Sequence, residues 1–149
     1  MAEQHISAEL RRLVADRGQH CCEYCRTQAR YSADSLTVDH ITPRSLDGLT
    51  TAENLALCCH GCNQHKSKRM AAPDPATDAR VPLFHPRAHR WEAHFAWNDD
   101  FTLMVGLTPT GRATIAALQL NRRGLVNLRR LLYAFGEHPP RPNPTNTAA

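Results

Sequence analysis

Two pairs of cysteines have the spacing of metal ligands. Two residues separate Cys22 from Cys25, and two separate Cys59 from Cys62. This spacing lets two thiolates from one tight turn reach the same tetrahedral ion, and two such pairs supply four ligands. Four sulfurs leave no open position on the ion, so we expect a structural Zn²⁺ site without chemistry of its own.

The cysteine pairs allow two other interpretations. A redox Cys-x-x-Cys motif needs a βαβ context, which the sequence lacks, and the pairs would otherwise be chance cysteines. Cys21 and Cys58 make the register ambiguous by one position. We prefer Cys22 and Cys59, because only these two close the two-residue spacing, and we expect the spare pair to be small buried hydrophobic residues.

Side chains suited to hydrolysis lie between and just after the cysteine pairs. Asp39 and His40 are adjacent, Asn54 follows in the next polar stretch, and Asn63 comes directly after the last cysteine. Histidine titrates near neutrality and suits a general base, whereas carboxylate and amide oxygens suit a hard divalent cation. Taken singly, each residue is more often structural: a satisfied histidine, a turn or cap asparagine, or a polar residue near a helix start.

Together, these residues form three motifs in a fixed order. Residues 38–43 read Val-Asp-His-Ile-Thr-Pro, residues 54–57 read Asn-Leu-Ala-Leu, and residues 62–66 read Cys-Asn-Gln-His-Lys. The set, interleaved with both cysteine pairs, closely resembles the HNH endonuclease family in its cysteine-framed form. The resemblance runs from about Cys22 to Lys68 and depends on the whole set, since an Asp-His pair alone carries no signal.

The resemblance implies a ββα-metal finger with one catalytic divalent cation, Mg²⁺ or Mn²⁺. Asp39 and Asn63 would then be the metal ligands, His40 the general base, and Asn54 the residue that holds the loop and orients His40. The implied activity is hydrolysis of phosphodiester bonds in nucleic acid, with DNA as the expected substrate. A strand normally directs adjacent side chains to opposite faces, so the strand should twist or end at the Asp-His pair.

Basic residues near these motifs are candidates for contact with substrate phosphates, which would position the nucleic acid without reading its sequence. Solvated surface charge is the competing interpretation. The candidates are His65, Lys66, Arg44, Lys68 and Arg69.

A non-catalytic zinc-knuckle module that binds nucleic acid is the alternative function. Such a module needs neither a general base nor a divalent-cation site. The four candidate catalytic positions all carry suitable residues, which favours the enzyme: Asp39, His40, Asn54 and Asn63.

Helix-capping residues, helix-ending residues and strand-forming residues predict the elements that must position these side chains. Ser7 is a suitable N-cap for a helix that ends near Gly18. Residues 36–41 are rich in β-formers and predict a short strand, and residues 55–58 suit a second strand or a helical turn. A helix is expected over about residues 60–69.

The C-terminal half predicts a β-hairpin and two helices. Residues 92–97 and 101–107 flank a turn, and Thr108 with Pro109 forms a helix start. Apolar residues at helical spacing then indicate two helices parted near Asn121. Arginines in this half would offer a second phosphate-contacting face or remain solvated: Arg112, Arg122, Arg123, Arg129 and Arg130.

We therefore predict an α+β fold: a ββα-metal (HNH) finger stapled by structural zinc, with a C-terminal β-hairpin and two-helix extension. The finger occupies residues 1–70, a linker rich in Pro, Asp and Ala spans 71–80, and the extension spans 81–138. The proline-rich residues 139–149 are expected to form a disordered tail.

Composition adds modest constraints. The formal net charge of +4 over 149 residues is only a weak argument for nucleic acid. The first twenty residues contain no apolar run long enough for a signal peptide or membrane span, so we expect a cytoplasmic protein without a membrane partner. Nothing in the sequence indicates the oligomeric state.

Overall fold

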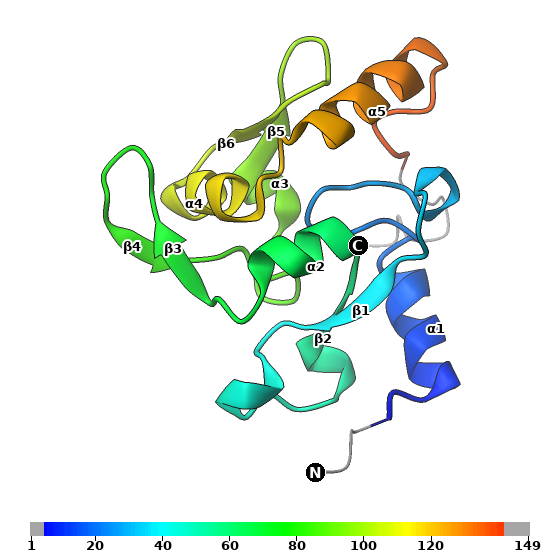
Figure 1. Ribbon diagram of the computed structural model, residues 1–149, viewed down its shortest axis with the longest axis vertical. Helices are drawn as coiled ribbons and strands as arrows, with labels where there is room; N and C mark the ends of the chain where they lie inside the picture. The colour runs from blue at the N-terminus through cyan, green and yellow to red at the C-terminus, as the bar shows by residue number, and fades with distance from the viewer. Residues whose placement is uncertain (1–4, 142–149) are drawn as a thin grey trace.

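The computed structural model describes residues 5–141, and Figure 1 shows the path of the chain through them. The elements are α1 (Ala8–Arg17), β1 (Thr37–His40), β2 (Leu55–Cys58), α2 (His60–Lys66), β3 (Ala71–Pro73), β4 (Arg80–Pro82), α3 (Trp91–His94), β5 (Phe95–Trp97), β6 (Met104–Gly106), α4 (Pro109–Leu118) and α5 (Arg123–Ala134). Three 3₁₀ turns lie in the connections, at Ala29–Tyr31, Arg44–Leu46 and Ala52–Asn54.

Helix α1 begins and ends where the sequence predicts. The Ser7 hydroxyl accepts a hydrogen bond from the Leu10 N–H at 3.1 Å, and the Gly18 N–H donates to the Val14 carbonyl at 3.0 Å. Val14 is fully buried and packs in an apolar cluster with Leu55 and Leu57 of β2. The helix therefore supports the strand pair that carries the Asp-His motif.

Strands β1 and β2 and helix α2 form the predicted ββα arrangement. The strands are antiparallel, with Asp39 opposite Ala56 and His40 opposite Leu55. Helix α2 follows at once, and the Cys59 sulfur caps it by accepting from the Cys62 N–H at 3.4 Å. The helix ends at Lys66, earlier than predicted, because Ser67 adopts φ 50° and ψ −129°, which are not helical angles.

The outer edge of β2 is closed by groups that are not part of a strand. The Glu23 N–H donates to the Leu57 carbonyl at 2.9 Å, and its side-chain Oε2 accepts from the Leu57 N–H at 2.7 Å. Arg17 Nη2 donates to the Leu55 carbonyl at 2.7 Å. Three polar backbone groups of this edge are thus hydrogen-bonded without a third strand.

The segment predicted as a linker forms a hairpin instead. Ala71 pairs with Pro82 and Pro73 pairs with Arg80, so β3 and β4 are antiparallel. In the turn, the fully buried Asp74 accepts from Arg112 of α4 through two contacts, Nε to Oδ1 at 3.0 Å and Nη2 to Oδ2 at 2.8 Å. The hairpin is therefore fixed to α4 by a two-point ion pair.

The predicted β-hairpin and two helices are present in the C-terminal half, but the hairpin strands are shorter than predicted, and residues 92–94 belong to helix α3 instead of a strand. Strands β5 and β6 are antiparallel, and Thr108 caps α4 by accepting from the Gly111 N–H at 3.0 Å. Gly111 is required here, because a Cβ at this position would lie 2.1 Å from the His94 carbonyl oxygen. Helix α4 thus lies close to the backbone at the end of α3.

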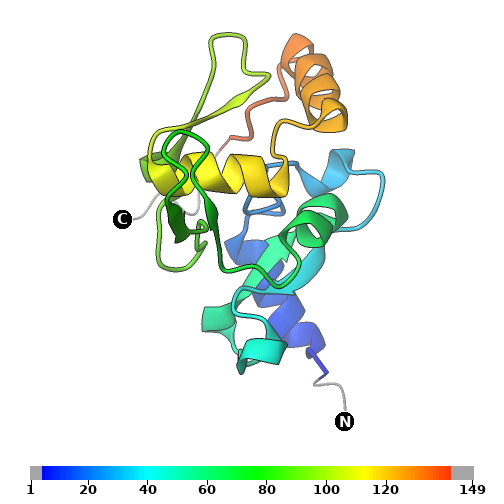
Figure 2. The ribbon, with the colours of Figure 1, turned by 60° about the vertical axis from the view of Figure 1, so that its left-hand side comes forward.

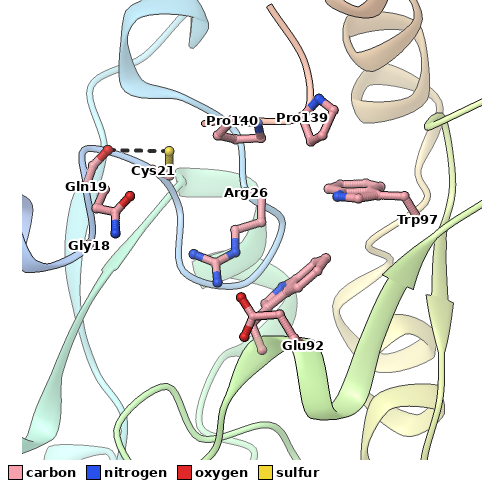
Figure 3. A pocket seen from close by; sticks show the side chains of 9 residues that line it. Gly18, Gln19, Cys21, Arg26, Glu92, Trp97, Pro139 and Pro140 are labelled. Atoms are coloured by element: carbon pink, nitrogen blue, oxygen red, sulfur yellow. Dashed lines mark hydrogen bonds between the residues drawn. The ribbon is translucent and has the colours of Figure 1, made fainter. Parts of the chain in front are cut away.

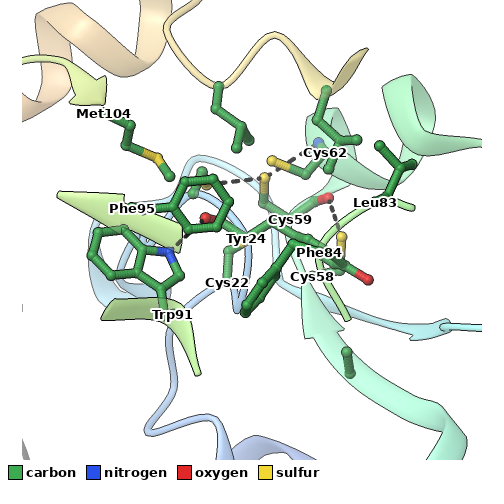
Figure 4. Packing of buried hydrophobic residues seen from close by; sticks show 14 of the residues in the cluster. Cys22, Tyr24, Cys58, Cys59, Cys62, Leu83, Phe84, Trp91, Phe95 and Met104 are labelled. Carbon is green, nitrogen blue, oxygen red and sulfur yellow. Dashed lines mark hydrogen bonds between the residues drawn. The ribbon is translucent and has the colours of Figure 1, made fainter. Parts of the chain in front are cut away.

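One apolar cluster connects the two halves of the chain. Helix α4 contacts α2, β3, β4 and β6, and Figure 2 shows it running across the middle of the molecule. Around it, buried side chains from both sides of residues 71–80 pack together with the cysteines (Figure 4). The cluster includes Tyr24, Ala56, Phe84, Trp91, Phe95, Met104 and Leu118.

Part of the predicted tail cannot be compared with the structure, because residues 142–149 lie outside the described residues. Pro139 and Pro140 are described and border a cavity beside Trp97 (Figure 3). Within residues 5–141, every helix is too short or too polar to cross a membrane.

Candidate active site and cysteine cluster

The four cysteines predicted as zinc ligands lie together. The sulfurs of Cys22, Cys25, Cys59 and Cys62 are all within 4.8 Å of one another, and all four residues are buried. Ligands at about 2.3 Å from a tetrahedral Zn²⁺ lie about 3.8 Å apart. The Cys25 and Cys59 sulfurs are 3.7 Å apart, so the cluster fits such an ion.

The other two cysteines form no part of this cluster. The Cys21 thiol donates to the Gln19 carbonyl at 3.5 Å, as Figure 3 shows, and the Cys58 thiol donates to the Cys59 carbonyl at 3.3 Å. Both are buried, as predicted for small hydrophobic residues. The four sulfurs that lie together are thus those of the preferred register, with Cys22 and Cys59.

Asp39 is a buried carboxylate with two partners on one oxygen. Its Oδ2 accepts from the Tyr24 hydroxyl at 3.2 Å and lies 3.2 Å from the Lys66 ammonium. Burial raises the pKa of Asp39, while Lys66 opposes that rise. Among residues 5–141, Oδ1 carries no hydrogen bond, so this oxygen remains available to a cation.

Lys66 is buried, whereas its predicted contact with substrate phosphates requires an exposed side chain. It is 2% exposed, and besides pairing with Asp39 it donates to the Ile41 carbonyl at 3.2 Å. Its charge therefore faces the candidate metal ligand and cannot project to a phosphate at the surface. The prediction of a phosphate contact at this position is corrected to a buried ion pair.

His40 is the last residue of β1 and is half-buried. Its Nε2 lies 2.9 Å from the Thr50 hydroxyl. Burial lowers the pKa of His40, and the nearby Arg44 lowers it further. The imidazole is therefore held in one orientation and favours the neutral form that a general base needs. Thr50 carried no sequence signal, because it lies in a loop at no fixed spacing from the histidine.

Asn54 holds the loop that follows His40. Its Oδ1 accepts from the Thr42 N–H at 2.8 Å, and its Nδ2 donates to the carbonyls of Thr42 at 3.0 Å and Leu49 at 2.8 Å. The side chain thus closes both ends of the 42–49 loop. The residue that contacts the imidazole is Thr50.

Three of the four predicted catalytic residues border one cavity of about 420 Å³: Asp39, His40 and Asn63. Adjacent residues at the end of β1 thus reach the same cavity. Asn54 does not line the cavity and holds the adjoining loop instead. The remaining lining residues are Val38, Pro43, Arg44, Ser45, Ser67 and Lys68.

The basic residues near the cavity separate into two groups. Arg44 and Lys68 line it, whereas His65 and Arg69 do not. Arg69 instead donates through Nη2 to the carbonyls of His65 and, at 2.7 Å, Ala117. Helix α2 ends before Lys68 and Arg69, so these residues do not continue a basic helix.

Several arginines expected to form a second phosphate-contacting face are directed inward. Arg112 pairs with Asp74, and the buried Arg129 donates to the carbonyls of Thr102 at 3.1 Å and Leu120 at 2.8 Å. Arg122 contacts the cysteine cluster, as described below. The guanidinium groups of these three arginines are bound to other groups of the protein, whereas the exposed residues of the set are Arg123 and Arg130.

A ββα unit with a carboxylate, a histidine and an asparagine around one cavity, next to a four-cysteine cluster, defines a metal-finger domain of the nuclease type. Residues 22–69 match the sequence model of the HNH endonuclease family, so the chain contains an HNH endonuclease domain.

The chain is also similar to the CRISPR-associated endonuclease Cas9 of Corynebacterium diphtheriae, with 43% identity over 61 residues. The matched part is 40% of this chain and 5% of that relative, so the chain spans a small fraction of the curated protein it resembles. No solved structure matches the chain.

Proposed function

We propose that the chain is a metal-dependent endonuclease that hydrolyses phosphodiester bonds, with DNA as its substrate. The observation that carries the proposal is the meeting of Asp39, His40 and Asn63 at one cavity, with the positive side chains of Arg44 and Lys68 on its wall. A phosphate in this cavity would meet a base, two oxygen donors and positive charge together.

His40 acts in this proposal as the general base that accepts a proton from the attacking water. Its lowered pKa keeps it neutral near pH 7, and the Thr50 hydroxyl fixes the ring. Asn54 helps to hold His40 in place, because it closes the 42–49 loop that starts two residues after the histidine.

Asp39 and Asn63 would hold the divalent cation, Mg²⁺ or Mn²⁺, through their side-chain oxygens. Such a cation, when bound, stabilises the charge that develops on the phosphate. Two protein oxygens suffice, because Mg²⁺ keeps several waters in sites of this kind. The carboxylate that faces it is kept ionised with help from Lys66.

Arg44 and Lys68 are proposed to contact phosphates of the nucleic acid, since both border the cavity. His65 and Arg69 would contact phosphates outside the cavity. A structural Zn²⁺ on the four cysteines is part of the proposal, because the sulfur spacing suits a closed tetrahedral site.

A plasmid-nicking assay with Mg²⁺, Mn²⁺ or EDTA tests the activity. His40→Ala should lower the cleavage rate by roughly 10² to 10⁴-fold, the usual contribution of a general base, and should leave DNA binding intact. His20→Ala is the matched control, because His20 is an exposed histidine on a different segment.

The same assay separates the base from the ligands. The defect of Asn63→Ala should be partly relieved by raising Mn²⁺, whereas that of His40→Ala should not. Asp39→Ala also leaves Lys66 buried without its partner, so it should lose stability as well as cleavage. DNA binding by a wild-type protein that cuts no substrate in any metal would refute the enzyme and favour the non-catalytic binding module.

A further inference from the structure

Arg122 lies against two of the four cysteine sulfurs. It directly precedes α5 and is half-buried. Its Nη2 donates to the Cys59 sulfur at 3.5 Å and to the Cys62 sulfur at 3.7 Å, and its Nη1 donates to the Cys62 sulfur at 3.6 Å. The guanidinium therefore spans both sulfurs of the second cysteine pair.

The position of the guanidinium is fixed from two sides. Nη1 also donates to the carbonyls of Leu118 at 3.3 Å and Gln119 at 3.2 Å, at the end of α4. On the other side lies Gly61, between the two cysteines, where a Cβ would be 2.5 Å from Nη2 and 3.0 Å from Cζ. The absent side chain at Gly61 thus leaves the room that the arginine fills.

The contact between Arg122 and the sulfurs matters because a metal-bound four-cysteine cluster is negatively charged. Four thiolates on Zn²⁺ carry a net charge of −2, and these cysteines are buried among apolar side chains such as Phe84 and Leu118. Uncompensated charge in such surroundings is costly. A guanidinium is always protonated and presents several donors in a rigid plane, so it can offset charge and satisfy two sulfurs at once.

We propose that Arg122 is a component of the zinc centre: it donates hydrogen bonds to the thiolates of Cys59 and Cys62, slows release of the metal, and joins the C-terminal extension to the zinc site. This inference depends on the proposed Zn²⁺ and not on the nuclease activity. It assigns the extension a role in completing a site whose ligands all belong to the first half of the chain.

Metal release from the purified, zinc-loaded full chain tests the proposal. Arg122→Met should weaken zinc retention by about 10 to 100-fold against a chromogenic chelator, the usual effect of losing a hydrogen bond to a metal ligand. Arg123→Met is the control, because it removes the same charge from the next residue, which is exposed. Arg122→Lys keeps the charge but loses the planar set of donors, so it should be intermediate.

The cobalt-substituted protein gives a second readout that packing alone would not move. Thiolates that lose hydrogen bonds donate electrons more readily, so the sulfur-to-cobalt charge-transfer band should move to longer wavelength in Arg122→Met. Gly61→Ala keeps the arginine but displaces its guanidinium, and it should shift the band in the same direction. This variant decides the question if Arg122→Met does not fold.

Two outcomes would overturn the proposal in different ways. If Arg122→Met and Gly61→Ala release zinc at the rate of Arg123→Met with an unshifted cobalt band, the guanidinium only packs beside the cysteines. A folded wild-type protein without metal would remove the zinc site as well. Plasmid nicking is measured separately, so failure of the nuclease proposal stays distinguishable from both.

Discussion

Asp39 and Lys66 form an ion pair with almost no access to water. Their side chains are 8% and 3% exposed, and the charged atoms are 3.2 Å apart. Burial of a lone carboxylate favours its neutral form, and the pKa of Asp39 is raised for that reason despite the lysine. The Lys66 ammonium therefore favours the ionised form of the Asp39 carboxylate, which is the form that binds a divalent cation.

Replacement of Lys66 by Met should destabilise the fold strongly. Loss of one partner leaves the other charge buried, which lowers the free energy of unfolding by about 3 to 5 kcal/mol. Urea denaturation of the zinc-loaded protein without added Mg²⁺ measures the effect, and Lys68→Met is the control because Lys68 is exposed. Added Mg²⁺ should restore part of the loss, since a cation on Asp39 replaces the missing charge. A Lys66→Met protein as stable as the control would contradict this account.

Sequence reasoning identified the residues that border the cavity and the loop-holding Asn54, but not the other side chains that support them. The cysteine pairs and the Asp-His motif are short-range patterns, so their spacing is visible in one dimension. Tyr24 and Thr50 contact Asp39 and His40 across loops whose length follows no rule. A lysine at the end of a polar helix is normally solvated, and only the tertiary packing turns Lys66 inward.

At the scale of elements, the β3–β4 hairpin is the largest departure from the sequence expectation. Its strands consist of Ala, Pro, Arg and Val, most of them poor strand formers, and its turn resembles a linker in composition. Asp74 holds the turn by accepting from the Ala76 N–H at 3.0 Å and the Thr77 hydroxyl at 3.2 Å. By contrast, α1 and α4 were predictable, because Ser7 and Thr108 cap them through contacts three residues away.

The Asp74–Arg112 pair predicts a pH-dependent stability. Hydrogen bonding from Arg112 holds the pKa of Asp74 at about 2, below the ordinary value of about 3.9. A lowered folded-state pKa stabilises the fold above about pH 4, and this contribution is lost as the pH falls toward 2.

Chemical denaturation at a series of pH values from about 5 to about 2 measures how the free energy of unfolding falls. In Arg112→Gln the pH dependence attributable to Asp74 should shrink or reverse, because the carboxyl no longer has its cation. Arg80→Gln is the control, since Arg80 is an exposed residue of the same hairpin. Equal slopes in both variants would show that the pair does not set the pKa of Asp74.

For the whole molecule, the continuous core predicts one cooperative unfolding transition. Trp91 and Trp97, the only tryptophans of the chain, lie in the C-terminal half, and Trp91 Nε1 donates to the Tyr24 carbonyl in the first cysteine turn at 3.2 Å. Tryptophan fluorescence therefore reports on the extension, and metal release reports on the cysteine cluster. The two signals should change at the same denaturant concentration. Separate midpoints would indicate two independently folding domains divided at residues 71–80.

The closed outer edge of β2 has a consequence for assembly. A strand with free N–H and C=O groups is a template on which another chain can add, and isolated two-stranded sheets offer such templates readily. Here the Leu55 and Leu57 backbone groups that would receive an incoming strand are occupied by Arg17 and Glu23. These two side chains therefore protect this edge against strand addition and aggregation, whereas the cavity is lined by residues of β1, the other strand of the sheet.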